Sequence, residues 1–240
     1  MISGLTAANM GAPDYALACE QHQGYIAALK ECGLQVTVLP PLESYPDSCF
    51  VEDVALLTSK CAILSCPGAP SRRGEVQHIV NAVAQFYPNL EHINLPATIE
   101  AGDIMMVDDH FYIGLSARTN VQGAEQLINI LGKYGLTGSM VEMSELLHLK
   151  TGVSYLENNN LLTFGEMHNN PIFKQFKRVE IDADESYAAN SVWINGTVFV
   201  PKGFPKALKA IKQLGYQTRE IAMSEFQKLD GGLSCLSLRF

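Results

Sequence analysis

Two residues of types that support nucleophilic chemistry lie in unusual sequence contexts. Cys235 follows a Gly-Gly turn in the segment DGGLSCLSLRF, which begins at Asp230. A cysteine attacks as its thiolate, so it needs a nearby base or a positively charged neighbourhood. His148 lies among leucines in LLHLK and ranks first among the six histidines as such a partner. The core alternative stays open, because free cysteines and lone histidines in apolar segments commonly pack inside proteins.

Acidic residues lie beside apolar segments at two places. Asp47, Glu52 and Asp53 occur in PDSCFVEDVALL, and Glu100 opens the segment EAGDI. Burying a carboxylate costs several kcal/mol (a rough figure) unless it meets a cation or hydrogen-bond donors. The pattern therefore favours a pocket for a cation, while acidic turns that cap neighbouring amides are the alternative.

Two arginines complement these acids. Arg72 lies in the turn-rich segment GAPSRRG, and Arg118 lies in GLSARTN after an expected strand. The guanidinium fork binds a carboxylate with two hydrogen bonds. Each arginine alone could be a surface residue. Together with the acids they indicate a zwitterionic ligand with a cationic tail, such as arginine.

Composition and charge exclude several classes of protein. The 240 residues carry 17 Lys and Arg against 25 Asp and Glu, a net charge of −8, with no dense basic block. This argues against nucleic acid as a partner. No apolar run is long enough to cross a bilayer, and the first residues show no secretory signal. The six cysteines form no C-x-x-C pair or zinc-ligand spacing, so we expect a cytoplasmic protein without membrane partners.

The elements expected to position these residues recur along the chain. Amphipathic stretches that end at glycine lead into short strands beginning near residues 35, 92, 138, 177 and 217. A second set of expected strands covers 51–57, 111–115, 161–164, 192–200 and 236–240. Helix periodicity, a glycine stop and a short strand indicate a mixed α/β fold. A unit of about 45 residues repeated five times favours one closed or stacked architecture.

The same motifs, taken in order, resemble the dimethylarginine dimethylaminohydrolase family. The resemblance rests on five segments that cover nearly the whole chain: DSCFVED from Asp47, PGAPSRR from Pro67, GLSARTN from Gly114, HLK from His148 and SEFQKLDGG from Ser224. Such a resemblance implies a five-bladed pseudo-symmetric α/β propeller of ββαβ modules, with residues 1–240 as a single catalytic domain. One departure is Ala101, where the family has a second glycine, and it matters if that position needs positive φ.

The resemblance also implies a role for each candidate. Cys235 resembles the nucleophile, His148 the general acid and base, and Glu100 the carboxylate that orients the histidine. Substrate-binding positions are implied for Asp53 at the guanidinium, for Arg72 and Arg118 at the α-carboxylate, for Asp47 and the carbonyl of Leu5 at the α-amino group, and for Glu52 and the backbone of Leu229.

The implied reaction is hydrolysis of Nω-methylated arginines to citrulline and a methylamine through a covalent thiouronium, with no metal or organic cofactor. The small-molecule substrate is the expected partner, and the sequence leaves a homodimer open. Two alternatives remain: a related amidino hydrolase such as an arginine deiminase-like enzyme, and a non-catalytic arginine-binding protein on the same fold. Arginine deiminases carry a helical insertion for which 240 residues leave no room, and agmatine has no carboxylate for the two arginines.

Overall fold

The computed structural model describes residues 1–240 as two compact units. One unit contains Ser48–Thr151 and Cys235–Phe240, and the other contains Met1–Asp47 and Gly152–Ser234. Both combine short strands with helices, so the predicted α/β class is confirmed. No helix is long and apolar enough to cross a lipid bilayer.

The unit that begins at Ser48 contains two modules of the order strand, strand, helix, strand. The first module consists of β1 (Ala55–Leu57), β2 (Ala62–Leu64), α2 (Val76–Val83) and β3 (Leu90–His92). The second consists of β4 (Ile104–Val107), β5 (His110–Leu115), α3 (Val121–Lys133) and β6 (Thr137–Glu142). In each sheet the first two strands pair antiparallel and the third pairs parallel to the second.

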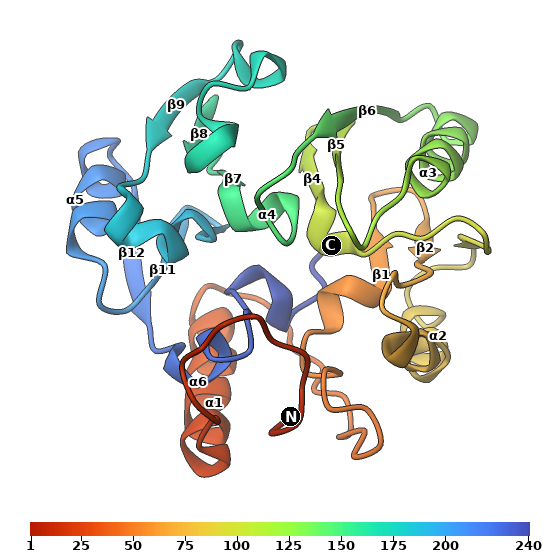
Figure 1. Ribbon diagram of the computed structural model, residues 1–240, viewed down its shortest axis with the longest axis horizontal. Helices are drawn as coiled ribbons and strands as arrows, with labels where there is room; N and C mark the ends of the chain where they lie inside the picture. The colour runs from red at the N-terminus through yellow and green to blue at the C-terminus, as the bar shows by residue number, and fades with distance from the viewer. The chain divides into compact units, whose positions relative to one another are not determined.

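The other unit repeats this sheet topology twice. One sheet contains β7 (Val153–Tyr155), β8 (Asn160–Thr163) and β9 (Lys177–Glu180), with 3-10 turns in place of a helix. The next module contains β10 (Val192–Ile194), β11 (Thr197–Pro201), α5 (Pro205–Gln213) and β12 (Gln217–Ile221). Two further helices are α1 (Tyr15–Glu31) and α6 (Ser224–Gln227). Figure 1 labels most of these elements and colours the chain from red at the N-terminus to blue at the C-terminus.

Glycine ends the helices where the sequence predicts. The left-handed residues Gly33, Gly135 and Gly215 follow α1, α3 and α5, with φ of 85°, 71° and 91°. Glycine takes this conformation without the steric cost that a Cβ brings, so each helix stops and the chain turns. After α3 and α5 the chain enters the parallel third strand of its sheet.

Several strand predictions differ from the structure. Residues 35–40 and 236–240 form no strand, and the predicted strand 192–200 is a hairpin broken at Asn195 and Gly196. Both of these residues have positive φ, at 45° and 88°, which is typical of a two-residue hairpin turn. The short strands β2, β4 and β7 were not predicted, since three or four residues are too few for a pattern to be recognised.

Three of the modules have a short helical turn directly before their first strand. The 3-10 helix η1 (Val51–Val54) precedes β1, and η3 (Ala101–Asp103) precedes β4. The four-residue helix α4 (Leu149–Gly152) precedes β7, and η7 (Ser234–Leu236) lies near the C-terminus. Asp53, Glu100, His148 and Cys235 all lie in or directly beside these turns, so the repeated module delivers one candidate residue at each.

Apolar side chains from the repeated elements form the core of each unit. In the unit containing β5, a cluster of buried residues includes Ile63, Ile104, Phe111 and Leu131. A separate cluster in the other unit includes Leu162, Val198, Val200 and Ile211.

Replacing Leu131 tests the packing of α3. Its side chain is 0% exposed, so Leu131→Ala should lower the free energy of unfolding by about 2–5 kcal/mol, measured by urea denaturation. Val121 begins the same helix at 50% exposure, and Val121→Ala should change stability by no more than about 0.5 kcal/mol. Equal effects of the two substitutions would contradict this placement of the core.

Candidate functional site

A histidine and three carboxylates meet in the unit that begins at Ser48. His148 Nε2 lies 2.8 Å from Glu100 Oε2, and Glu100 is completely buried. One carboxylate oxygen each of Asp53 and Glu100 and one ring nitrogen of His148 lie within 4.8 Å of one another. Asp103 is also fully buried, and its Oδ1 accepts a hydrogen bond from the backbone of Leu149, the residue after His148. The structure thus brings three sequence-predicted residues together.

Arg72 neutralises one side of this cluster. Its Nη1 donates to Asp53 Oδ2 at 2.5 Å, and its Nη2 donates to Glu75 Oε2 at 2.9 Å. The Arg72 Nη2 also donates to the carbonyl of Phe50 at 3.0 Å. The three charged side chains are each no more than 5% exposed, so they form a buried ion cluster. The sequence pattern indicates Arg72 as a ligand for a carboxylate, and nothing in the sequence points to Glu75 as its partner.

Burial and neighbouring charges set the ionisation of the cluster. Burial acts to lower the pKa of His148, but Asp53, the hydrogen bond with Glu100 and the charge of Asp103 raise it to about 9. Burial acts to raise the pKa of Asp53, and the Arg72 guanidinium and His148 outweigh it, so this pKa lies below its ordinary value. Burial acts to raise the pKa of Glu100, but the hydrogen bond with His148, the charge of His148 and the backbone N–H of Ala69 together lower it. The histidine is therefore an imidazolium at neutral pH, facing ionised carboxylates.

The second predicted arginine lies at the edge of this cluster. Arg118 Nη1 is 3.4 Å from Glu100 Oε1, and its side chain keeps 22% exposure. Glu100 Oε1 also accepts the backbone N–H of Ala69 at 3.1 Å. Glu100 is thus held on one oxygen by Arg118 and Ala69, while its other oxygen faces His148.

Gly102 allows His148 to approach the carboxylates closely. A Cβ at Gly102 would lie 2.7 Å from Asp53 Oδ1 and 2.9 Å from His148 Nδ1, which is too close for either atom. The Gly102 N–H donates to the same Asp53 oxygen at 3.0 Å. Ala101 is buried in η3, and its φ is not positive. An alanine therefore fits at the position where the family has a glycine.

The nucleophile candidate Cys235 belongs to the same compact unit as Glu100 and His148. It lies in η7, is partly exposed and forms no disulfide. The C-terminal segment that follows is anchored within this unit: Arg239 Nη2 lies 3.5 Å from Glu52 Oε1, and the Phe240 ring lies 5.3 Å from that of Tyr87.

Glu52 has two cationic neighbours. Its Oε1 lies 2.6 Å from Lys150 Nζ and 3.5 Å from Arg239 Nη2, and Glu52 is 4% exposed. The sequence pattern of an acid next to an apolar segment predicts a cation partner, and the structure supplies protein cations for both Glu52 and Asp53. Lys150 follows His148 in the HLK motif, which is a signal that could have identified it.

The remaining candidates lie in the other unit. The backbone N–H of Leu5 donates to Asp47 Oδ1 at 2.8 Å, and Asp47 is 5% exposed. A Cβ at Gly4 would lie 2.7 Å from the same Asp47 oxygen and 3.5 Å from Leu229 Cδ1. Leu5, Asp47 and Leu229 are therefore neighbours.

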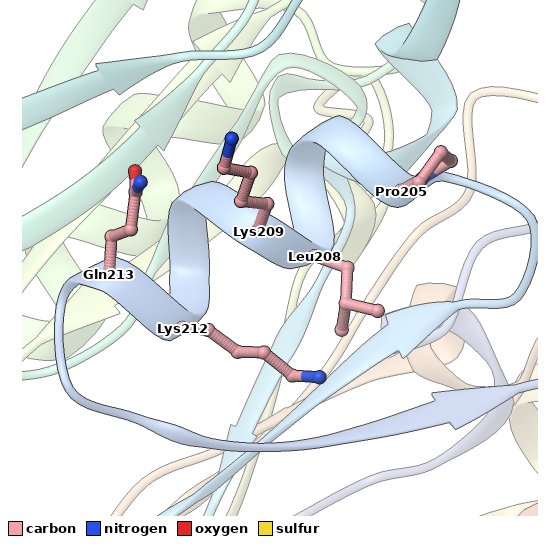
Figure 2. A pocket seen from close by; sticks show the side chains of 5 residues that line it. All are labelled: Pro205, Leu208, Lys209, Lys212 and Gln213. Atoms are coloured by element: carbon pink, nitrogen blue, oxygen red, sulfur yellow. The ribbon is translucent and has the colours of Figure 1, made fainter.

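The surface pocket of this unit holds none of the predicted site residues. All of its lining side chains belong to α5, as Figure 2 shows: Pro205, Leu208, Lys209, Lys212 and Gln213. These side chains include no cysteine, histidine or carboxylate.

The repeated strand modules and the buried histidine–carboxylate pair define an α/β protein that holds groups suited to acid–base chemistry. Comparison with known proteins narrows this class. The family described as N,N dimethylarginine dimethylhydrolase, eukaryotic, matches residues 13–152, more than half of the chain. The chain belongs to the dimethylarginine dimethylaminohydrolase family.

Individual relatives are similar over the whole chain. The N(G),N(G)-dimethylarginine dimethylaminohydrolase of Pseudomonas aeruginosa is 55% identical over 100% of this chain and 95% of its own length. A crystal structure of a mutant of that enzyme complexed with citrulline matches with a TM-score of 0.99, covering 100% of this chain and 94% of that one. A dimethylarginine dimethylaminohydrolase adduct with S-methyl-L-thiocitrulline matches with a TM-score of 0.98 at the same coverage and identity. These matches confirm the predicted fold class.

Substitution of Gly102 tests the close packing around His148. Gly102→Ala should destabilise the fold by about 1–3 kcal/mol, because neither Asp53 nor His148 has room to move without breaking a buried contact. Ala101→Gly is the matched control and should cost no more than about 1 kcal/mol, mainly backbone entropy. Urea denaturation measures both, and a larger loss for Ala101→Gly would contradict the assignment of the required glycine to position 102.

The raised pKa of His148 makes stability depend on pH. Because the folded pKa of about 9 lies above the ordinary value of 6.5, protonated His148 stabilises the fold fully below pH 6.5. That contribution is lost as pH rises through about 9. The stability difference between wild type and His148→Gln should therefore shrink between pH 6.5 and 9.

His110 provides a control of opposite sign. Burial lowers the pKa of His110, so the stability that its neutral form contributes is lost as pH falls below 6.5. The difference between wild type and His110→Gln should grow as pH rises towards 6.5. A pH-independent difference for His148→Gln would contradict an imidazolium in the folded protein.

Proposed function

We propose that this protein is a cysteine hydrolase that cleaves Nω-methylated arginines to citrulline and a methylamine. The observation that carries the proposal is the buried contact of His148 with Glu100 beside Asp53 in a member of this family. A proton donor for a departing amine and carboxylates for a guanidinium are the groups this reaction needs. The citrulline bound in the Pseudomonas aeruginosa relative supports citrulline as the product.

The substrate guanidinium is assigned to the carboxylates of the unit that begins at Ser48. Asp53 would face the guanidinium nitrogens, with Glu52 at a lining position. The ionised state of Asp53 supports this assignment, since a carboxylate with a lowered pKa stays negative when a cation arrives. Holding the planar guanidinium also fixes its central carbon in front of the nucleophile.

The amino-acid end of the substrate needs one anion site and one cation site. Arg118, with its partly exposed side chain, is assigned to the α-carboxylate. Arg72 is assigned there by the family resemblance, and within the protein its guanidinium also holds Asp53. The α-amino group is assigned to Asp47 and the carbonyl of Leu5, with the backbone of Leu229 as a further contact. The hydrogen bond between Leu5 and Asp47 supports this pairing.

The first chemical step breaks the bond between carbon and the methylated nitrogen. The Cys235 thiolate attacks the guanidinium carbon, and the electron pair of the breaking C–N bond goes to the departing nitrogen. The His148 imidazolium donates its proton to that nitrogen, so the amine leaves neutral. A positively charged thiouronium remains on Cys235, and Glu100 keeps the histidine oriented.

The second step returns the enzyme to its starting state. Neutral His148 accepts a proton from water, and the oxygen attacks the thiouronium carbon. The C–S bond then breaks, its electron pair returns to sulfur, the hydroxyl proton passes to solvent, and citrulline is released. A bound substrate cation and the His148 imidazolium both favour the Cys235 thiolate, so we propose that the thiolate forms on binding.

Two organisational proposals accompany the function. We propose that residues 1–240 act as a single catalytic domain, which the match to a relative over 100% of this chain supports. A cytoplasmic location is proposed because six cysteines occur without a disulfide, a usage typical of a reducing compartment.

Measurement of citrulline release tests the function. Wild-type protein should produce citrulline and one equivalent of dimethylamine from asymmetric dimethylarginine, and citrulline and methylamine from monomethylarginine. Cys235→Ser should lower this rate by more than about 10³-fold, because the hydroxyl is not ionised at neutral pH. Cys19→Ser is a matched control, since that partly exposed cysteine has no proposed role.

Two other outcomes of this measurement would favour the alternative functions. Faster turnover of unmethylated arginine would move the protein to arginine deiminase-like chemistry. Binding of dimethylarginine without citrulline release would identify a non-catalytic arginine-binding protein. Either result would contradict the proposal. Substrate choice has to be measured, because one methyl group changes the binding free energy by only about 1 kcal/mol.

A further inference from the structure

Asp103 is a fully buried acid with no part in the chemistry proposed above. It ends η3, three residues after Glu100, and is 0% exposed. Ionised carboxylates are rarely buried without partners that satisfy them. Its contacts therefore indicate what it does.

Three donors surround the Asp103 carboxylate. Its Oδ2 accepts hydrogen bonds from Ser116 Oγ and Thr119 Oγ1, both at 2.7 Å. Its Oδ1 accepts the backbone N–H of Leu149 at 2.9 Å. Leu149 is the first residue of α4 and directly follows His148, so this bond fixes the backbone that carries the imidazole.

The same network reaches the partner of His148. Thr119 Oγ1, which donates to Asp103, accepts the backbone N–H of Glu100 at 3.2 Å. Ser116 Oγ accepts the backbone N–H groups of Arg118 and Thr119 at 3.0 and 3.2 Å. Asp103 therefore connects the backbone beside His148, through Leu149, with the backbone of Glu100, through Thr119. This connection is independent of the contact between the His148 and Glu100 side chains.

The charge of Asp103 also acts on the imidazole. The charged groups around His148 are Asp53, Glu100 and Asp103, with Arg72 paired to Asp53 and Arg118 to Glu100. Burial raises the pKa of Asp103 despite its hydrogen bonds and the nearby imidazolium. Its ionised form helps to keep His148 protonated.

We propose that Asp103 is a positioning residue that holds His148 against Glu100 and helps to keep it protonated. The role in turnover rests on the proposed function, whereas the effect on His148 is a property of the protein without substrate. Asp103 touches neither the substrate nor the reacting atoms in this scheme, so it acts through His148 and its partner Glu100.

Asp103→Asn separates charge from shape. The asparagine carbonyl can still accept the Leu149 N–H, and its amide can donate to Thr119 Oγ1, which has one lone pair left. Ser116 Oγ already accepts two backbone N–H groups, so only its bond to residue 103 is lost and the Leu149 backbone stays anchored. The titration of His148 is followed by NMR of 13C-labelled histidine, with its signal assigned by its loss in His148→Gln. The midpoint in Asp103→Asn should fall by about one pH unit. With dimethylarginine, kcat should fall by about 10- to 100-fold, with KM changed by less than about 3-fold.

Glu185→Gln is the matched control. Glu185 is 6% exposed and accepts the backbone N–H groups of Lys206 and Ala207, at 3.0 and 2.7 Å, at the start of α5. It is thus a buried acid at a helix start in the other unit. Glu185→Gln should leave the His148 midpoint unchanged, which separates an effect on His148 from the general cost of losing a buried acid.

A second variant covers a failure of Asp103→Asn to fold. Ser116→Ala removes one donor to Asp103 and leaves the carboxylate, so kcat should fall by about 3- to 10-fold with the His148 midpoint kept within about 0.3 pH units. A wild-type midpoint and kcat in Asp103→Asn, or an unchanged kcat in Ser116→Ala where Asp103→Asn does not fold, would overturn the proposal. If wild-type protein releases no citrulline, the proposed function fails, and the His148 titration still decides the role of Asp103.

Discussion

The candidate site depends on keeping several carboxylates ionised away from water. Asp53, Glu75 and Glu100 are nearly or fully buried, and each is stable as an anion only because a cation lies against it. Arg72 serves two of them, and His148 serves Glu100. Removing one partner of such a pair leaves an uncompensated buried charge, which costs about 3–5 kcal/mol. This requirement explains why arginine, a group that cannot release its proton, holds Asp53.

The repeated module explains how these charges meet. Asp53, Glu100 and His148 each lie at a short helical turn directly before the first strand of a module. Equivalent points of a repeated unit can be brought together without long loops, and the nearby glycine at 102 removes the atom that would separate the imidazole from the acids. Side chains on such turns are held by the ladder of the following strand, which favours a preorganised site.

The sequence predicts this arrangement in part. Acids beside apolar segments indicate Asp53 and Glu100, and the apolar surroundings single out His148 among the histidines. Glu75 could not be predicted, because an acid after SRRG reads as an ordinary surface residue and its partner is known only once η2 (Pro70–Glu75) is folded. The strand predictions at 35–40 and 236–240 were wrong for a similar reason: an alternating pattern shows that a segment can be a strand, and only a partner makes it one. Whether alanine can replace glycine at position 101 also depends on the backbone φ there, which the sequence does not show.

The central proposal is that buried acids keep His148 protonated, and that this imidazolium assists Cys235, which carries the substrate covalently. Intact-protein mass spectrometry after acid quenching during turnover of dimethylarginine tests it most directly. We expect an adduct with the mass of dimethylarginine minus dimethylamine, located by digestion to the peptide that contains Cys235 and absent in Cys235→Ser. Turnover to citrulline with no adduct under conditions where hydrolysis of the adduct limits the rate, or an adduct on another cysteine, would contradict it.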